Sequence, residues 1–207
     1  MKKCCGCKQI LTFDCFGVNP AQPSGYAGEC KECRRNRKKA IDASVSAWLA
    51  DYALEGESLK RAAVRFFVEN LSQEDYLIWI NKWCSFDEQT QCVNWEGTKA
   101  HAGHGNFNVP IPSEWRGTKT TSTHHITWAM HHGIDALPMA GQKMTPDTLV
   151  LDHLCQNPSC VNPYHLQVIT HSENSQLAHV DRMPPPRLKE LDVDDEFRGI
   201  VRGMVSA

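Results

Sequence analysis

The chain has 207 residues, 41% of them hydrophobic, which is enough to bury a core in one modest domain plus a smaller module, or in two small domains. Its formal net charge is −2, and it contains no run of about 18 apolar residues, so we expect no membrane-spanning helix. No apolar run follows Met1, so we expect no secretory signal peptide. Ten cysteines without such a signal favour reduced thiols and metal sites over disulfides.

The first segment, residues 1–39, contains two Cys-x2-Cys pairs. They are Cys4 with Cys7 and Cys30 with Cys33. Two such pairs on tight turns can hold four thiolates tetrahedrally about one ion, so they predict a structural zinc site. A site with four protein ligands has no open position, and we expect it to fold the module rather than to catalyse. The alternative is free reduced cysteines whose spacing is accidental.

A basic block ends this segment. Residues 31–39, KECRRNRKK, carry six basic groups and one acid. Such a block beside a rigid module can follow nucleic-acid phosphates even when the whole chain is slightly acidic. The alternative is a solvated, charged start of a helix. The side chains predicted to contact phosphates are those of Arg34, Arg35, Arg37, Lys38 and Lys39.

Helical periodicity dominates residues 40–86. Apolar residues from Ile41 to Tyr52 recur at helical spacing, and the pattern repeats from Leu59 to Leu71. Ser72 begins a third such stretch and has the character of an N-cap. We expect residues 40–86 to form a helical connecting region.

Residues 87–182 change character and predict a mixed fold. Residues 92–110 contain two short strands around a glycine-rich turn, and residues 124–132 form a helix that Gly133 stops. Strands at 148–154 and 166–170 then flank a loop, and a helix follows at 171–180. Residues 183–207 open with prolines and turn acidic. The expected fold class is α+β, divided into segments 1–39, 40–86, 87–182 and 183–207.

The strand that ends in Asp152-His153 carries the first catalytic candidates. Neighbouring side chains on a strand point to opposite faces, so these two can take different roles. Asp152 offers a hard oxygen to a divalent cation, and His153 can take a proton from water near neutral pH. A strand, loop, strand and helix of this length can return Asn174 as a second oxygen ligand. This is the chemistry of phosphodiester hydrolysis; the alternative is a surface Asp, a core His and a capping Asn.

A family resemblance follows from these residues and their neighbours. Asp152-His153, Cys155, Cys160-Val-Asn-Pro-x-His165 and Thr170-x-x-Glu173-Asn174 together resemble the HNH endonucleases of phages and mobile elements, which share the ββα-metal fold. Three upstream segments are also similar to that family: Cys92-x-x-Trp95-x-Gly97, Gly103-His-Gly-Asn-Phe107 and Thr123-His-His-Ile126. The double Cys-x2-Cys module resembles one that often precedes this nuclease domain.

The resemblance implies roles for five residues. Asp152 is the expected metal-binding Asp, His153 the general base and Asn174 the helix-borne ligand of a catalytic Mg²⁺ or Mn²⁺ ion. His165 stands at the middle position of the motif, which orients the base in relatives. Asn162 lies in the loop of the family pattern and is expected to brace it.

Two departures from the family pattern bear on these roles. His125 stands where relatives have an arginine that faces phosphate, so we expect a DNA contact there with a weaker hold on phosphate. His104 replaces a tyrosine, and we interpret it as a tolerated packing change.

A second structural zinc is also predicted. Cys155, Cys160 and His165 supply three ligands around the loop between the two strands. Cys92 is the expected fourth ligand, because its strand recurs with this motif in the family, and Cys84 is the competing candidate. The alternative is reduced cysteines packed under the loop. If His165 binds zinc, Asn162 or a backbone carbonyl must orient His153 instead.

The sequence therefore predicts a metal-dependent HNH endonuclease that nicks or cuts DNA, as a monomer or homodimer, with one or two structural Zn²⁺ ions. The resemblance places it in the cytoplasm of a bacterial host, encoded by a phage or mobile element. The alternative is a catalytically idle, zinc-dependent DNA-binding regulator that keeps the fold, which the intact Asp152, His153 and Asn174 set disfavours. A redox role for the Cys-x2-Cys pairs is weaker still, because no thioredoxin-like βαβ pattern surrounds them.

Overall fold

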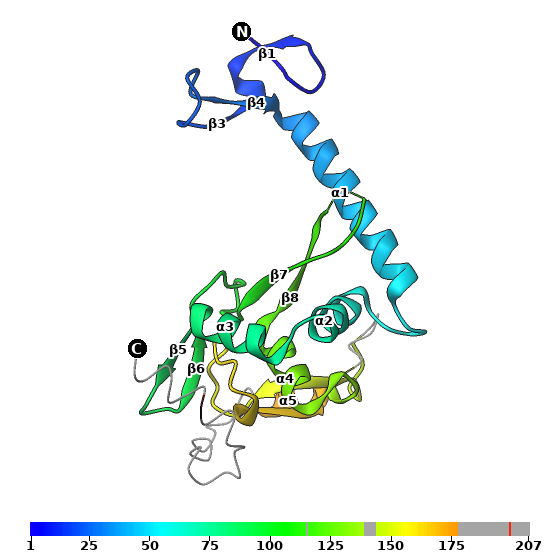
Figure 1. The fold of residues 1–207 in the computed structure, drawn as a ribbon, viewed down its shortest axis with the longest axis vertical. Coiled ribbons are helices and arrows are strands. Elements are labelled where there is room, and N and C mark those ends of the chain that lie inside the picture. The colour runs from blue at the N-terminus through cyan, green and yellow to red at the C-terminus, as the bar shows by residue number, and fades with distance from the viewer. Residues whose placement is uncertain (115, 139–143, 178–198, 200–207) are drawn as a thin grey trace. The chain divides into compact units, whose positions relative to one another are not determined.

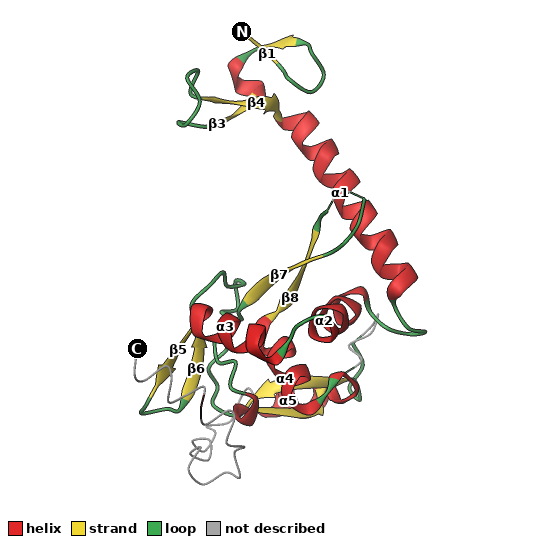
Figure 2. Ribbon diagram, viewed as in Figure 1, coloured by secondary structure: helices red, strands yellow, loops and turns green. Residues whose placement is uncertain are grey.

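The computed structural model describes residues 1–114, 116–138, 144–177 and 199. The chain forms two compact units: Met1–Trp48 with Ile111–Thr118, and Leu49–Pro110 with Lys119–Ala207. The expected α+β class is confirmed, with helices and short two-stranded sheets along the chain (Figure 2). The four-segment division stays a prediction. The acidic tail at 183–207, apart from residue 199, and the end of the last expected helix lie outside the described residues.

The first unit is a small cysteine-rich module that leads directly into a long helix. Its elements are β1 (Lys2–Lys3), β2 (Ile10–Leu11), η1 (Phe13–Cys15), β3 (Phe16–Val18), β4 (Tyr26–Cys30) and most of α1 (Lys31–Tyr52). β1 pairs with β2 and β3 with β4, both antiparallel. Cys4, Phe16 and Cys30 form the buried cluster of its cysteine-rich part, and Leu11, Cys15, Tyr26 and Cys33 pack against it. A core this small cannot hold the module together unaided, which is the usual setting for a structural metal.

The second unit contains two helices of the connecting region and the strands and helices that follow. Its elements are α2 (Leu59–Glu69), α3 (Gln73–Trp83), β5 (Cys84–Asp87), β6 (Cys92–Trp95), β7 (Asn106–Pro110), β8 (Thr118–Ser122), α4 (Thr123–His132), η2 (Ile134–Ala136), β9 (Leu149–His153), η3 (Pro163–His165), β10 (Leu166–Thr170) and α5 (His171–Leu177). The sheets are the pairs β5–β6, β7–β8 and β9–β10 (Figure 1). No helix in the described part of the chain combines the length and apolar character needed to cross a membrane.

Local signals in the sequence explain where these helices begin and end. The hydroxyl of Ser58 accepts a hydrogen bond from the Arg61 amide, and that of Ser72 accepts one from the Asp75 amide, so each serine caps the helix that follows it. Gly133 has a φ of 81° and ends α4, as predicted.

An aromatic cluster joins α2 and α3 to the strands. Trp79 of α3 lies 5.2 Å from Trp95 of β6 and 5.4 Å from Phe107 of β7, between ring centroids. Phe67 of α2 lies 5.2 Å from the same Phe107. Trp95 is only 2% exposed. The helices at 59–83 and the strands at 92–110 therefore share one hydrophobic core.

A buried ion-pair network fixes the start of α2. The Glu57 carboxylate, whose side chain is 0% exposed, accepts hydrogen bonds from Arg61 at 2.6 Å and Arg65 at 2.9 Å. Arg61 also donates to the carbonyls of Ile134 and Leu137, which ties α2 to the segment after α4. Burial alone would raise the pKa of Glu57, but the hydrogen bonds from Arg65 and the Leu54 amide prevail and lower it.

Replacing Glu57 by Gln should lower the free energy of unfolding by about 3 kcal/mol or more, because two arginines lose their buried counter-charge. Glu55→Gln, at an exposed position, is the matched control and should change it little. Urea titrations give both values. Because the folded-state pKa of Glu57 is depressed, the difference between parent and variant should be full near pH 7 and shrink as the pH falls through that pKa. A constant difference down to acid pH would contradict the network's role.

Candidate active site and zinc sites

The β9–β10 hairpin fixes Asp152 and His153. Asp152 pairs with Gln167 and His153 with Leu166 in the antiparallel register. The side-chain amide of Gln167 donates to Asp152 Oδ2 at 2.9 Å. Both candidate side chains are buried, Asp152 at 7% exposure and His153 at 6%. A carboxylate and an imidazole are thus held side by side at the end of one strand.

Helix α5 brings Asn174 to the same hairpin. Thr170 and Glu173 form a reciprocal capping box: the Thr170 amide donates to Glu173 Oε2 at 2.8 Å, and the Glu173 amide to Thr170 Oγ1 at 3.2 Å. The amide of His171 also bonds to the Thr148 carbonyl at 2.7 Å, just before β9. α5 packs on both strands (Figure 1), with Asn174, partly buried, at the end of its first turn.

His153 is held in one tautomer by the loop between the strands. Its Nε2 lies 3.0 Å from the carbonyl oxygen of Cys160. Because a carbonyl only accepts, Nε2 carries the proton and the lone pair resides on Nδ1. Burial lowers the pKa of His153 to about 4, so the ring is neutral at pH 7, the form in which it can accept a proton.

The loop that supplies this carbonyl is pinned to β6. The Val161 amide donates to the Val93 carbonyl at 2.7 Å, and the Trp95 amide to the Ser159 carbonyl at 2.9 Å. Cys160 itself forms a bridge with Asn94. The loop is therefore attached to β6 through one antiparallel bridge and the flanking hydrogen bonds, which hold the Cys160 carbonyl beside His153.

The two Asn-Pro dipeptides are turn supports. Asn157 accepts a hydrogen bond from the Ser159 amide at 3.0 Å and donates to Asn94 Oδ1 at 2.7 Å. Asn162 accepts one from the Tyr164 amide at 3.0 Å and donates to the Gln91 carbonyl at 3.0 Å. Asn157 thus ties the loop to β6, and Asn162 ties it to the residue just before that strand.

A sulfur-rich group lies beneath the same loop. Cys92, Cys155, Cys160 and His165 present ligand atoms within 4.8 Å of one another. His165 Nδ1 is 3.6 Å from both Cys92 Sγ and Cys160 Sγ. Tetrahedral zinc with bonds of about 2.3 Å separates its sulfurs by roughly 3.8 Å, so three thiols and an imidazole this close fit the ion. The neighbouring thiols of Cys155 and Cys160 lower the pKa of Cys92, which favours the thiolate that zinc requires.

This grouping bears on two alternatives that the sequence leaves open. Cys92 rather than Cys84 lies with the other three ligands. His165 directs Nδ1 at sulfur, while a backbone carbonyl, that of Cys160, bonds to His153. The geometry favours His165 as a zinc ligand over His165 as the group that orients the base.

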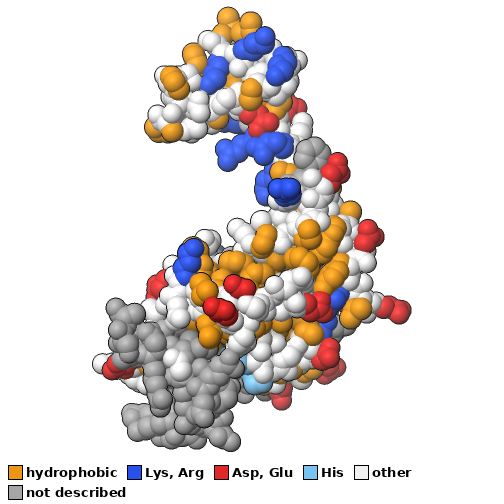
Figure 3. All heavy atoms as spheres, in the orientation of Figure 1, with side chains coloured by type: hydrophobic (Ala, Val, Ile, Leu, Met, Phe, Trp, Pro, Cys, Tyr) orange, Lys and Arg blue, Asp and Glu red, His pale blue; other side chains and the backbone are white. Residues whose placement is uncertain are grey.

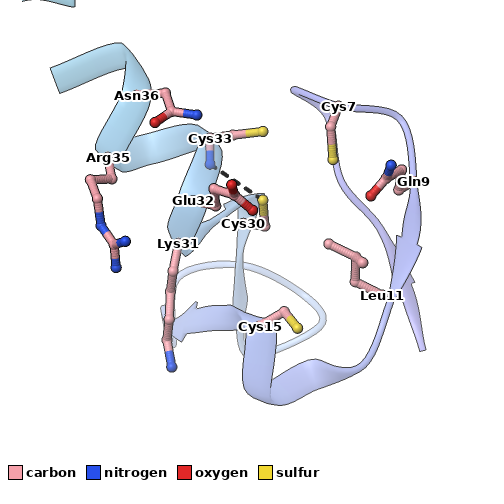
Figure 4. A pocket seen from close by; sticks show the side chains of 10 residues that line it. All are labelled: Cys7, Gln9, Leu11, Cys15, Cys30, Lys31, Glu32, Cys33, Arg35 and Asn36. Atoms are coloured by element: carbon pink, nitrogen blue, oxygen red, sulfur yellow. Dashed lines mark hydrogen bonds between the residues drawn. The ribbon is translucent and has the colours of Figure 1, made fainter. Parts of the chain in front are cut away.

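The N-terminal cysteines also converge. Cys4, Cys7, Cys30 and Cys33 present sulfurs within 4.8 Å of one another. Backbone amides point at them. The Cys30 amide lies 3.2 Å from Cys4 Sγ. The Cys33 amide lies 3.4 Å from Cys30 Sγ, a bond drawn in Figure 4. The bond from the Cys30 amide lowers the pKa of Cys4 to about 6. Four thiols with amide donors around them form a group compatible with a structural zinc module.

The basic block lies on the first turns of α1, within the first unit. Arg37 is held by Glu29 at 3.2 Å and Lys38 faces Asp42 at 3.5 Å. Arg34, Arg35 and Lys39 are exposed and make no ion pair among the residues that the structure describes. Basic side chains stand out on this unit in Figure 3.

His125, the residue in the family's arginine position, is partly buried at the start of α4. Burial, with the charge of Lys60 as a smaller cause, lowers the pKa of His125 to about 4. It is neutral at pH 7 and supplies no cation to a phosphate.

Sequence reasoning missed one feature of this region. His104 and His124 lie beside His153, and one ring nitrogen of each lies within 4.8 Å of the others. The signal in the sequence was the histidine at position 104, where the family has tyrosine. Interpreting that histidine as a packing change overlooked the metal-binding capacity of its ring nitrogens.

Residues 122–176 match a family model described as HNH endonuclease. The matched segment runs from α4 through the β9–β10 hairpin to α5 and contains Asp152, His153 and Asn174. The chain therefore contains a segment similar to the HNH endonuclease family, preceded by a four-cysteine group compatible with a zinc module. No curated protein and no solved structure matches the chain.

Elemental analysis of the purified chain should give two zinc ions per molecule. Cys92→Ser should reduce this to one, because it removes a ligand from the second group. The matched control is Cys84→Ser, at a partly buried cysteine outside that group, which should retain two zinc ions. The second zinc site would be excluded if the parent contained one zinc ion, or if the two variants contained equal amounts of zinc.

Proposed function

We propose that the chain is a metal-dependent endonuclease that hydrolyses phosphodiester bonds in DNA. One observation carries the proposal. Asp152 and His153 end strand β9, and the helix that bears Asn174 packs on that strand, all within the segment that matches the HNH family. An active nuclease needs these oxygen and nitrogen donors together, whereas an idle DNA-binding protein has no use for them.

His153 is the proposed general base. Its Nε2 proton is engaged by the Cys160 carbonyl, so Nδ1 is the atom that takes the proton from the attacking water. Although burial depresses its pKa in the free protein, a bound phosphate places negative charge nearby and favours the imidazolium that forms.

Asp152 and Asn174 are the proposed ligands of the catalytic ion. A carboxylate and an amide oxygen suit a hard divalent cation such as Mg²⁺ or Mn²⁺. Such a cation supplies charge that polarises the scissile phosphate and stabilises the leaving 3′ oxygen. Gln167 holds one carboxylate oxygen of Asp152 and thereby sets the direction of the other.

The second zinc group has a positioning role in this proposal. Cys160 offers its thiol to the zinc group and its carbonyl to His153. Zinc bound there would therefore fix the residue that orients the base, which is how supporting interactions preserve a catalytic geometry.

The hold on DNA falls to lysine and arginine, since His125 is neutral at pH 7. The exposed Arg34, Arg35 and Lys39 are the foremost candidates, with Arg37 and Lys38 beside them. The family resemblance supports a phage or mobile-element gene acting in a bacterial cytoplasm. A homodimer would supply the two active sites that double-strand cutting usually needs, and a monomer would nick.

His153→Ala should cut supercoiled plasmid about a hundred- to ten-thousand-fold more slowly than the parent in Mg²⁺, the range for loss of a general base. His101→Ala, at an exposed histidine, is the control and should cut at the parent rate. Plasmid nicking followed on gels, with EDTA as a blank, measures all three. The proposal fails if His153→Ala and His101→Ala cut equally fast.

Asp152→Ala should also lose cleavage, but through weaker binding of the catalytic ion. Excess Mn²⁺ should therefore restore part of its activity and none of that lost in His153→Ala, where a proton acceptor is missing. If excess Mn²⁺ restored the same fraction of activity in both variants, the separate roles of Asp152 as metal ligand and His153 as base would be contradicted.

Replacing Arg34, Arg35 and Lys39 together by Gln should weaken DNA binding and flatten its salt dependence. The slope of log K against log salt should fall by about 0.9 for every phosphate that the variant no longer neutralises. Arg37→Gln should have a smaller effect, because Glu29 already neutralises that charge. Fluorescence anisotropy at several salt concentrations measures the slopes. An unchanged slope in the triple variant would remove α1 from the DNA interface.

A further inference from the structure

Three histidines from three separate segments meet at the proposed base. His104 precedes β7, His124 lies in the first turn of α4, and His153 ends β9. Their ring centroids are 4.8 to 5.4 Å apart, and one nitrogen of each lies within 4.8 Å of the others. His104 and His124 belong to neither cysteine group. They are also distinct from Asp152 and Asn174, the proposed ligands of the catalytic ion.

The cluster leaves polar atoms without a hydrogen bond. The Nδ1 atoms of His104 and His124 are buried and have no hydrogen-bond partner among the residues described. His124 is only 5% exposed. Buried polar atoms in native proteins almost always have a partner, so orphaned nitrogens at one place indicate a missing ligand.

The backbone holds His104 in this position. A Cβ on the neighbouring Gly105 would lie 2.2 Å from Thr123 Oγ1, and one on Gly103 would lie 2.9 Å from Pro158. The Thr123 amide also donates to the Gly105 carbonyl at 3.0 Å. The two glycines thus let the chain approach both α4 and the loop closely, and this packing directs His104 toward the base.

We propose that His104, His124 and His153 form a binding site for a transition-metal ion such as Zn²⁺ or Co²⁺, and that the bound ion inhibits cleavage. Imidazole nitrogens suit these ions, whereas Mg²⁺ and Ca²⁺ prefer oxygen. Buried imidazoles are neutral, the form that binds metal. The ion would take the lone pair that His153 needs to accept a proton. This inhibitory effect rests on the proposed function; the binding itself does not.

The test uses the full chain after its resident zinc has been measured. Co²⁺ is added and its binding is followed by isothermal titration calorimetry, and X-ray absorption at the cobalt edge identifies its ligands. His104→Tyr carries the residue that similar nucleases have at this position, and His104→Gln is a second variant. His101→Gln is the matched control. Resident zinc content and thermal unfolding verify that each variant is folded.

The parent and His101→Gln should bind one further Co²⁺ ion with nitrogen and oxygen ligands and no sulfur. In the His104 variants this binding should weaken at least about tenfold, since removing groups that merely support a ligand already weakens metal sites about 10- to 100-fold. An ion held by Asp152 and Asn174 alone would bind all four proteins equally, and that result overturns the site. Absence of any further ion in the parent also overturns it.

Plasmid cleavage in Mg²⁺ with increasing Zn²⁺ tests inhibition, with each rate expressed relative to that protein's own rate in Mg²⁺ alone. The parent and His101→Gln should be inhibited at Zn²⁺ concentrations at least about tenfold lower than the His104 variants. Equal inhibition of all proteins overturns the inhibitory role. A parent that binds the further ion but never cuts DNA refutes the proposed function while the metal site stands.

Discussion

The attachment of the 154–165 loop to strand β6 is the constraint on which the candidate active site depends. Main-chain hydrogen bonds to Val93 and Trp95 and a bridge between Asn94 and Cys160 attach the loop to this strand. Cys160 lies at its centre, where its carbonyl bonds to His153 and its thiol joins Cys92, Cys155 and His165. Cys160 therefore links the tautomer of His153 to the packing of the sulfur ligands. The tautomer and the packing both depend on the hydrogen bonds between the loop and β6.

Much of the fold could be predicted from the sequence because local signals agreed with the tertiary structure. Ser72 as a cap, apolar periodicity and Gly133 marked the helices, and the spacing of the four N-terminal cysteines indicated their convergence. Thr170 and Glu173, which belong to the family pattern, form a capping box. In each of these cases the structure is determined by contacts between residues a few positions apart, or by pairs of cysteines on tight turns.

What could not be predicted depends on contacts between distant segments. The choice of Cys92 over Cys84 follows from the pairing of β6 with the loop, which brings residues about 70 positions apart together and leaves no local trace. His104 and His124 approach His153 only because Gly103 and Gly105 allow the chain close to Pro158 and Thr123. Apolar periodicity in 59–83 indicated helices but not the partner of their apolar faces, which is the aromatic cluster of β6 and β7.

That shared aromatic cluster has a consequence for how such a domain is inherited. The family match covers residues 122–176, yet Trp95 and Phe107 lie upstream of it and are covered by Phe67 and Trp79 of α2 and α3. A gene fragment that encoded only the matched segment would leave behind the strand that supports its catalytic loop, and one that began at β6 would expose a tryptophan and a phenylalanine to water. The segment that recombination can transfer as a folded unit must therefore include α2, α3, β6 and β7. It is much longer than residues 122–176, the segment that matches the family.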